Sequence, residues 1–533
     1  MILYLIITAI IIFACVIMNK LSNRFGVPTL LAFIGLGMLF GVEGPFRFAF
    51  DNFEMTENIC TVALIFIMFY GGFGTNWKVA KKVVPASVLL STAGVVMTAT
   101  VCAVFCHFVL RFSWVESFLM GSVISSTDAA SVFSILKSRK LSLKYNTASV
   151  LELESGSNDP VAYMMTAVFI SVAQGNASGG QIVYMIFAQL VYGAAIGAGI
   201  SLFALWVFKK TKGMGDGLNM IFVIGIALAA YAVPAIAGGN GYLSTYIVGI
   251  VLGNSRIKDK AELVHFFDGI TLAAQILVFF LLGFLSTPSN FPAVIVPGII
   301  IALFLTFAAR PAVVFALLTP FKAKLNQKLL VSWSGLRGAS SIVFAISVFL
   351  GAKTENNIFY ITFFIVLFSI FLQGTLLPKV SEKLNMIDEN ENVMKTFTDY
   401  TDEVPIQYIK CNIPEGHEWS GRQIRDVSIP PETIFVLLKR KGENIVPTGK
   451  TVIESGDCLV LSAKKPVDIE GIELREIIVR QGDDEYLGKS LAEISTSNSW
   501  LVIMIQRDSD VIIPKGDVIL QEGDILVINE VDA

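Results

Sequence analysis

Long apolar runs, joined by short connectors up to about residue 385, constrain this chain more than any other feature. Several exceed the ~18 residues that indicate a membrane-spanning helix. Hydrophobic residues make up 54% of the chain and charged residues only 16%, whereas soluble proteins usually carry about 25% charged residues. We therefore expect a polytopic α-helical membrane protein. The net charge of −3, without a long basic run, gives no indication of nucleic-acid binding.

About 13 membrane spans are predicted from these runs. They lie at residues 2–18, 27–41, 57–72, 84–110, 115–136, 150–174, 181–208, 218–234, 242–253, 266–285, 293–317, 329–351 and 358–377. The first run has no basic n-region and no A-x-A cleavage site, so we expect an uncleaved helix rather than a signal peptide. The span at 242–253 is short for a ~30 Å hydrocarbon core, which suits a helix buried in a bundle.

Positive charge predicts the orientation. Alternate connectors carry 18 cationic residues: Lys20, Arg24, Lys78, Lys81, Lys82, Lys137, Arg139, Lys140, Lys144, Lys209, Lys210, Lys212, Arg256, Lys258, Lys260, Lys322, Lys324 and Lys328. The opposite connectors carry only Arg47, Arg111 and Lys353. We therefore expect the N-terminus outside the cell and the C-terminal tail in the cytoplasm. The six cysteines form no CxxC pair and there are three histidines, so neither a zinc site nor another resident cofactor is expected.

The fifth span carries the polar run SSTDAAS at residues 125–131. Asp128 is the fourteenth of the 22 residues 115–136, which places it near the middle of the membrane. Small and hydroxylated residues around one carboxylate favour a span that unwinds and turns backbone carbonyls toward a cation. The alternative is a polar kink packed against neighbouring helices. A charge at this depth costs at least ~2.5–3.5 kcal/mol, which favours the functional interpretation.

The sixth span carries the run LELESGSNDP at residues 151–160. On a helix Ser155 and Asp159 share one face, and Glu154 and Asn158 share the adjacent face. Carboxylates, an amide and hydroxyls within two turns form an oxygen-rich set that suits a hard cation. We expect a monovalent ion here; the alternative is a buried polar network that holds helices together.

The twelfth span carries the run SGLRGASS at residues 334–341. Arg337 needs an anionic partner at this depth, and Glu154 is the predicted one. Arg310 in the eleventh span is a weaker candidate, which either pairs with a carboxylate or reaches an interface. If spans 1–6 and 8–13 are inverted repeats, the fifth and twelfth helices occupy corresponding places. Secondary transporters built this way bind ions at the membrane midplane, often between discontinuous helices.

The segments SSTDAAS, LELESGSNDP and GLRGA, in this order, resemble those of the monovalent cation/proton antiporters. The resemblance covers roughly residues 1–380 and is to the bacterial NhaP type, in the electroneutral branch with Asn-Asp rather than Asp-Asp on the sixth helix. It implies that Asp159 binds both ion and proton. The residues that it implies as the site for K⁺ or Na⁺ are Asp159, Asp128, Ser155 and Thr127, the last through its backbone.

The same resemblance implies a structural ion bridge between Glu154 and Arg337, supported by Asn158. It also implies a homodimer in which each chain has a dimerisation domain and a moving six-helix core, and the exchange of one cation for one proton. A buried carboxylate holds either a proton or a cation but not both. If the core moves only when Asp159 is neutralised by one of them, exchange is obligatory.

After residue 385 the composition becomes that of a soluble protein, with an internal repeat of period 67 residues. The matching positions are Gly421 and Gly488, Pro447 and Pro514, Gly449 and Gly516, Gly456 and Gly523, and Asp457 and Asp524. The runs TIFVLLKRKG and SWLVIMIQRDS predict strands. We therefore expect a membrane domain (1–383), an acidic linker (384–402) and two small α/β domains (403–465 and 470–533).

Each repeated domain resembles the C-terminal subdomain of regulators of potassium conductance, the TrkA-C type. Neither contains the GxGxxG run of a dinucleotide-binding domain, so control by NAD is not expected. Similar domains in potassium transporters bind cyclic di-AMP at a dimer interface, which makes a small regulatory nucleotide our hypothesis for this tail. A purely structural dimerisation module is the alternative.

These features predict a K⁺/H⁺ antiporter of the bacterial plasma (inner) membrane, regulated by its tail and serving potassium, cell-volume and pH homeostasis. Na⁺ or Li⁺ exchange at the same site is the alternative, and the paired regulator domains favour potassium. A regulated K⁺ channel is more distant, because no TVGYG-type filter occurs in the chain. The run GMGD at 213–216 imitates an intramembrane protease signature but lies in a connector, so a transporter rather than an enzyme is expected.

Overall fold

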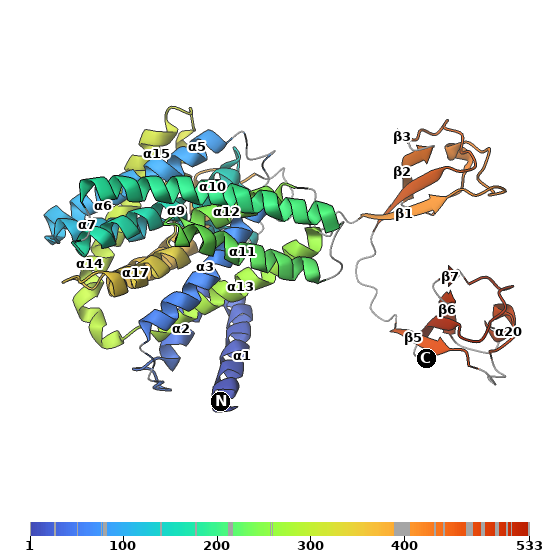
Figure 1. Cartoon of the computed structure of the whole chain (residues 1–533), viewed down its shortest axis with the longest axis horizontal. Coiled ribbons are helices and arrows are strands. Elements are labelled where there is room, and N and C mark those ends of the chain that lie inside the picture. Colours follow the sequence, from blue (N-terminus) through green and yellow to red (C-terminus); the bar gives the residue numbers. More distant parts are fainter. Residues whose placement is uncertain are drawn as a thin grey trace. The chain divides into compact units, whose positions relative to one another are not determined.

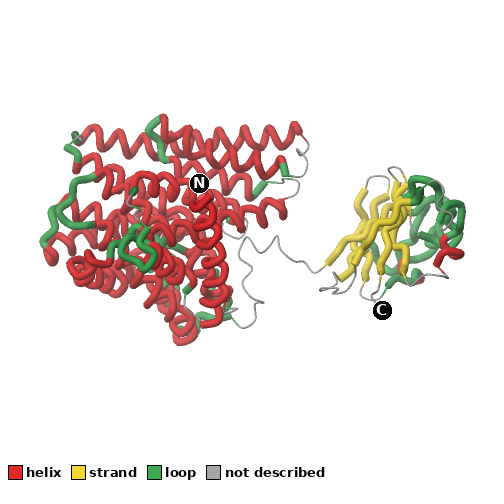
Figure 2. The backbone as a smooth tube through the Cα atoms, turned by 90° about the horizontal axis from the view of Figure 1, so that it is seen from below, coloured by secondary structure: helices red, strands yellow, loops and turns green. Residues whose placement is uncertain are grey.

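The computed structural model divides into a first unit, Met1–Asp402, and a second unit, Glu403–Ala533. Helices make up most of the first unit, and the named strands lie in the second (Figures 1 and 2). The structure describes residues 2–25, 28–48, 50, 52–75, 77, 81, 83–138, 141–175, 178–211, 217–255, 257, 260–388, 406–430, 433–440, 443–464, 473–480, 486–495, 500–507, 510–512 and 514–530.

The helices of the first unit follow the apolar runs of the sequence. They are α1 (Ile2–Phe25), α2 (Thr29–Phe40), α3 (Phe53–Gly74), α5 (Val84–Leu89), η1 (Leu90–Gly94), α6 (Val95–Leu110), α7 (Trp114–Ser125), α8 (Ala129–Ser138), α9 (Thr147–Ala173), α10 (Gly179–Thr211), α11 (Leu218–Ile236), α12 (Gly241–Gly253), α13 (Lys260–Phe284), η2 (Pro288–Asn290), α14 (Phe291–Phe304), η3 (Leu305–Ala309), α15 (Arg310–Leu318), α16 (Leu325–Trp333), α17 (Ala339–Gly351), α18 (Ile358–Phe368), η4 (Ser369–Gly374) and α19 (Thr375–Lys383). The segments η1, η3 and η4 are π-helical turns that continue the helices around them.

Every predicted span overlaps a helix in the described part of the chain, which confirms a polytopic helical membrane protein. Seven helices of the described residues are long and apolar enough to cross a membrane by themselves. The fifth span is interrupted between α7 and α8, and the twelfth between α16 and α17. The prediction of discontinuous helices is therefore confirmed. Seven of the cationic residues used for the orientation lie outside the described residues: Lys78, Lys82, Arg139, Lys140, Lys212, Arg256 and Lys258.

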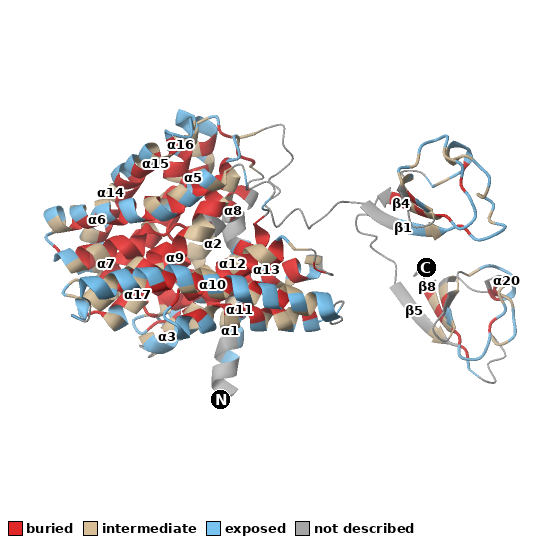
Figure 3. Ribbon diagram, turned by 45° about the horizontal axis from the view of Figure 1, so that its top comes forward, coloured by how far each residue is buried: buried red, intermediate tan, exposed pale blue. Residues whose placement is uncertain are grey.

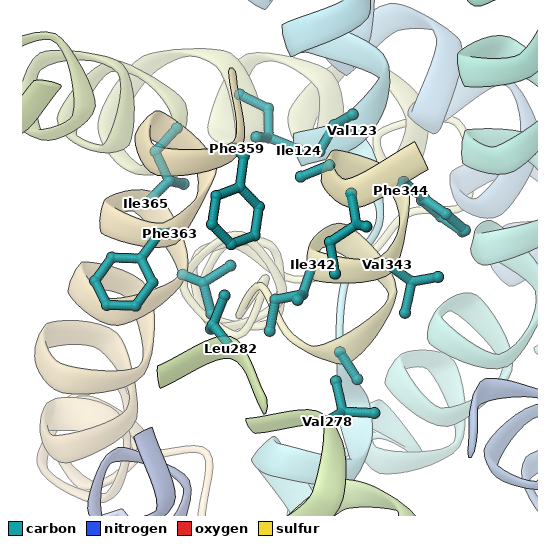
Figure 4. Packing of buried hydrophobic residues seen from close by; sticks show 14 of the residues in the cluster. Val123, Ile124, Val278, Leu282, Ile342, Val343, Phe344, Phe359, Phe363 and Ile365 are labelled. Atoms are coloured by element: carbon teal, nitrogen blue, oxygen red, sulfur yellow. The ribbon is translucent and has the colours of Figure 1, made fainter. Parts of the chain in front are cut away.

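The centre of the first unit is apolar and closely packed. Figure 4 shows Ile342, Val343 and Phe344 of α17 among side chains from α7, α13 and α18. Buried residues fill the interior in Figure 3. Large apolar side chains also face outward, such as Phe13, which is 68% exposed, and Ile236, which is 88% exposed. Outward apolar faces suit a surface covered by lipid.

Glycines bring some helices into backbone contact. A Cβ atom on Gly37 of α2 would lie 2.1 Å from the carbonyl oxygen of Phe280 in α13. A Cβ atom on Gly249 of α12 would lie 2.3 Å from the carbonyl oxygen of Phe69 in α3. Small residues allow this close packing in membranes, where helices associate through van der Waals contact. We call the helices α2, α3, α12 and α13 the frame. Backbone contacts join α2 to α13 and α3 to α12 within it.

The first unit continues past the last helix. The backbone N–H of Lys144 donates to the carbonyl oxygen of Met386 at 2.8 Å, and that of Asp388 donates to Ser142 at 2.9 Å. Met386 is fully buried. The predicted linker begins at residue 384, but residues 386–388 still pair with the helical unit; the rest of it, 389–402, lies outside the described residues.

The tail folds as two copies of one small sheet. The first contains β1 (Ile406–Asn412), β2 (Thr433–Arg440), β3 (Glu443–Ile445) and β4 (Cys458–Lys464), with a 3-10 turn η6 (Ile424–Asp426). The second contains β5 (Glu473–Ile478), β6 (Trp500–Arg507), β7 (Asp510–Ile512) and β8 (Ile525–Glu530), with a short helix α20 (Leu491–Ser495). The strand orders, β1-β4-β2-β3 and β5-β8-β6-β7, correspond. The two predicted strands are β2 and β6.

Each copy contains the same ion pair, between an arginine at the end of its second strand and an aspartate just before its fourth strand. The Arg440 guanidinium donates to Asp457 at 2.8 and 2.7 Å, and the Arg507 guanidinium donates to Asp524 at 2.7 and 2.8 Å. The hydrogen bond from Arg440 lowers the pKa of the Asp457 carboxyl below its usual range. The repeat detected in the sequence is thus a repeat of fold and of side-chain contacts.

Candidate functional site

The two interrupted helices meet at their breaks. Residues 126–128 separate α7 from α8, and residues 334–338 separate α16 from α17. The backbone N–H of Asp128 donates to the carbonyl oxygen of Leu336 at 2.8 Å. Small and polar residues at both breaks permit this contact, because they leave room for the facing backbone. The ends of the interrupted helices therefore lie together inside the membrane unit.

Arg337 stabilises one of these half-helix ends. Its guanidinium is 1% exposed and donates to the backbone carbonyls of Ser125 at 2.9 Å and Ser126 at 2.5 Å. These carbonyls close the C-terminal end of α7, where the helix dipole is negative and a cation is stabilising. Arg337 therefore compensates the negative end of the α7 dipole inside the membrane unit.

Asp128 has the complementary position at the start of α8. Its carboxylate accepts from the backbone N–H of Ser131 at 3.2 Å and from the Ser131 hydroxyl at 2.5 Å. This is the geometry of a helix N-cap, in which a carboxylate satisfies the first N–H groups and the positive end of the dipole. The same carboxylate packs against Gly338, whose Cβ atom, if present, would lie 2.0 Å from Asp128 Oδ2.

Asp159 lies on α9 and faces the break in the fifth span. It is 7% exposed and accepts a hydrogen bond from the hydroxyl of Ser126. The Ser126 hydroxyl also lies 2.9 Å from that of Ser340 at the start of α17. One buried carboxylate is thus held by hydroxyls from both interrupted helices.

The other sixth-span residues bind the same break. The Ser155 hydroxyl donates to the carbonyl oxygen of Thr127 at 2.8 Å. The Asn158 amide donates to the Thr127 hydroxyl at 2.5 Å. The structure therefore brings Asp159, Ser155 and Thr127 together as the sequence predicts. Asn158 contacts the unwound segment itself rather than the predicted ion bridge.

The partner of Glu154 differs from the prediction. Glu154 Oε1 lies 2.5 Å from Arg310 Nη2, and both side chains are at most 4% exposed. The predicted Glu154–Arg337 bridge is therefore wrong as a direct contact, since Arg337 donates to the α7 carbonyls. Arg310 follows the π-helical turn η3, and its pairing with a carboxylate is one of the two alternatives that the sequence leaves open. Ser126 and Ser340 lie within the recognised motifs but were not singled out.

A cavity of about 380 Å³ leads to Asp159. Asp128, Ser155 and Thr127 also line it, together with two carboxylates outside the predicted set, Glu152 and Asp268. No group of three or more His, Cys, Asp or Glu side chains placed to hold a metal occurs among the described residues. Carboxylate, hydroxyl and carbonyl oxygens are instead the ligands of a hard cation. The geometry suits a transported ion held by one buried carboxylate and neutral oxygens.

Comparisons with known proteins agree with this geometry. A family model described as sodium/hydrogen exchanger, transmembrane, matches residues 9–383, and a TrkA-C domain model matches residues 411–467 and 474–528. The chain is 31% identical over 455 residues to the "K(+)/H(+) antiporter NhaP" of Alkalimonas amylolytica, covering 84% of this chain and 79% of that protein. It is 30% identical over 473 residues to the "K(+)/H(+) antiporter NhaP2" of Shewanella baltica (strain OS223), covering 87% and 82%.

A solved structure has the same fold. The sodium proton antiporter MjNhaP1 from Methanocaldococcus jannaschii at pH 8 superposes with a TM-score of 0.63 and 22% identity, covering 72% of this chain and 99% of that chain. The helical unit therefore has the fold of a known antiporter structure, and two TrkA-C domains follow it in the chain. This chain belongs to the sodium/hydrogen exchanger family and is a multi-pass cation/proton antiporter, a transporter rather than an enzyme.

Proposed function

We propose that this antiporter exchanges cytoplasmic K⁺ for external protons, with Asp159 as the carboxylate that carries either one. The observation that carries the proposal is a single buried carboxylate that lines a cavity of about 380 Å³ and is bound by hydroxyls from both interrupted helices. A proton or a cation neutralises Asp159, and the two compete for it. Ser155 and the Thr127 carbonyl provide neutral oxygens beside it.

Asp128 has a supporting part in this mechanism. It caps α8 and lies at the edge of the same cavity. Its negative charge adds to the attraction for a cation while it stabilises the helix end. Arg337 offsets the opposite helix end, and the Glu154–Arg310 pair contributes no net charge. Of the charges near the breaks, Asp159 is thus the one whose neutralisation fits one-for-one, electroneutral exchange.

The cavity is proposed to open toward the cytoplasm. Gly74, Glu152 and Asp268 line it, and each lies near a helix end that adjoins a lysine-bearing connector. Those connectors are cytoplasmic by the distribution of positive charge. The predicted orientation in a bacterial plasma membrane, N-terminus outside and tail inside, follows the same argument. Alternating access then exposes Asp159 to the outside in a second conformation.

Potassium is proposed over sodium for two reasons. Two relatives that match most of this chain are named K⁺/H⁺ antiporters, and the tail carries two domains of the TrkA-C type. We also propose that the tail regulates exchange, with a small nucleotide such as cyclic di-AMP as its ligand, and that the chain acts as a homodimer. Na⁺ or Li⁺ exchange remains the second candidate, because the oxygen ligands of the site fit these ions as well.

Replacing Asp159 by Asn tests the site. In everted vesicles or proteoliposomes, a pH dye would follow proton movement after addition of K⁺, Rb⁺, Na⁺ or Li⁺. We expect exchange by Asp159→Asn to fall to the protein-free background, because a neutral amide has no negative charge for which a proton and a cation can compete. Glu54→Gln, which removes an exposed carboxylate at the start of α3, is the control and should exchange normally.

The results of this assay test the assignment of the site and the choice of K⁺ separately. Coupled exchange retained by Asp159→Asn would overturn the site assignment. A wild-type response to Na⁺ and Li⁺ but not to K⁺ and Rb⁺ would replace the potassium proposal with the sodium one. Size-exclusion chromatography of each variant shows whether the protein is folded, so that a loss of exchange is a loss of function.

A further inference from the structure

Two residues on the frame line the cavity that leads to Asp159. Tyr70 lies near the end of α3 and Asp268 near the start of α13, and both line the cavity. The Tyr70 hydroxyl donates to Asp268 Oδ1 at 3.2 Å. Asp159, Ser155 and Ser340 line the same cavity from α9 and α17. Carboxylates from a frame helix, α13, and from α9 therefore line the same cavity.

The four carboxylates that line the cavity differ in burial. Asp268 is exposed, Glu152 and Asp128 are half-buried, and Asp159 is buried. Among the described residues that line the cavity, none is Lys, Arg or His. A concave site lined by one sign of charge concentrates counter-ions and raises their rate of entry. Asp268 is the outermost of these charges and the first that an entering cation meets.

The Tyr70–Asp268 hydrogen bond is not needed to join α3 to α13. Phe267, the residue before Asp268, is fully buried and its ring lies 5.0 Å from that of Phe69 and 6.4 Å from that of Phe66. These aromatic contacts already pack the two helices together. A neutral hydroxyl orients the Asp268 carboxylate without cancelling its charge, so the bond holds a charged group at the cavity entrance.

We propose that Asp268, oriented by Tyr70, is an affinity-determining residue that collects cations at the cavity entrance for Asp159. This inference rests on the proposed cation exchange and on the cytoplasmic opening of the cavity. Asp268 is not a ligand of the final site. It raises the local cation concentration, so its removal acts on the apparent KM for the cation and leaves the maximal rate to Asp159.

The test compares Asp268→Asn with two other variants in the full-length protein. Asn is the same size as Asp and still accepts the Tyr70 hydroxyl, so this variant removes the charge and keeps the hydrogen bond. Tyr70→Phe removes the hydrogen bond and keeps the charge. Glu262→Gln removes an exposed carboxylate from the first turn of the same helix, outside the cavity, and is the matched charge control.

In everted vesicles, where added cation reaches the cytoplasmic face, we expect Asp268→Asn to raise the apparent KM about three- to tenfold at low ionic strength. Its maximal rate should stay near that of the wild type, as should both constants of Glu262→Gln. Tyr70→Phe should raise the KM less than Asp268→Asn does. Adding an impermeant salt such as choline chloride should reduce the difference, because screening weakens attraction by an exposed charge.

Each cation that the wild type exchanges is used in turn, so a preference for Na⁺ would overturn the potassium proposal and leave this test intact. An unchanged KM in Asp268→Asn, or one no higher than in Glu262→Gln, would overturn the inference. So would a lower maximal rate at unchanged KM, which is the result expected of a merely structural residue. A KM increase that salt does not reduce would exclude electrostatic collection.

Discussion

Arg310 and Arg337 are both buried in the membrane unit, yet their partners are different in kind. Arg310 pairs with the Glu154 carboxylate, whereas Arg337 donates to backbone carbonyls at the end of α7. Both arrangements place negative charge or carbonyl oxygens beside a guanidinium that lies away from water, where an uncompensated charge is costly. Residue type and depth therefore predict that each arginine has a partner, but not which partner it has.

We predict that the Glu154–Arg310 pair stabilises the folded protein. Arg310→Met leaves Glu154 as an unpaired buried charge, and we expect the free energy of unfolding to fall by about 3–5 kcal/mol. The double variant Arg310→Met/Glu154→Met removes both charges and should recover much of this loss. Unfolding titrations with SDS in mixed micelles would measure the difference. If the double variant were as unstable as Arg310→Met alone, the two residues would not form the stabilising pair.

The sequence predicts where the helices of this protein lie better than it predicts which helices pack against one another. The apolar runs predict where the spans lie, because a spanning helix must be about 20 residues long and apolar. The polar run around Asp128 also predicts the interruption of the fifth span. The π-helical turn before Arg310 and the contact of Arg310 with Glu154 could not be predicted. Both depend on which helices pack side by side, and the sequence of a single span does not indicate its packing partners.

We predict that the close contact between the two interrupted helices at Gly338 is needed for exchange. In Gly338→Ala the new Cβ atom would meet the Asp128 carboxylate, so one of the two breaks must shift. We expect a loss of about 1–3 kcal/mol in stability and a larger relative loss of exchange, because the shift moves Ser340 away from Ser126. Gly225→Ala in α11, where a Cβ atom meets nothing within 4 Å, is the control.

Melting temperature and exchange rate would be measured for both glycine variants. Gly338→Ala with normal exchange would mean that the close contact at the crossing is not required for transport. Equal losses in both variants would indicate a general effect of alanine in these helices rather than a local clash.

At the scale of the whole molecule, the chain joins a transport unit to a duplicated tail. The two sheets have the same strand order and the same Arg–Asp pair, which the 67-residue repeat predicts. The surroundings of this pair differ between the copies: Arg440 also pairs with Glu454, and the position that corresponds to Glu454 in the second copy is Gln521. The two copies therefore share a fold and an Arg–Asp pair without being identical.

Removing the tail tests its role. The chain should be cut after Asp388, because residues 386–388 still pair with residues 142–144 of the transport unit. We expect the truncated protein to exchange cations, with a rate or pH profile that differs from the full-length protein and no response to cyclic di-AMP. The pH-dye assay on both proteins at equal amounts would show this. Identical rates, pH profiles and nucleotide responses would contradict tail regulation.

The glycine contacts of the frame make the stiffness of the transport unit uneven. Where Gly37 meets Phe280 and Gly249 meets Phe69, backbone touches backbone, and such contacts have no soft side chains to yield. At Gly156 of α9, by contrast, the neighbour is the ring of Tyr246, which can turn about its own bonds. A load on the molecule would deform the boundary around α9 before it deforms the frame. The frame is therefore the rigid part of the transport unit, and α9 with Asp159 lies along its more compliant boundary.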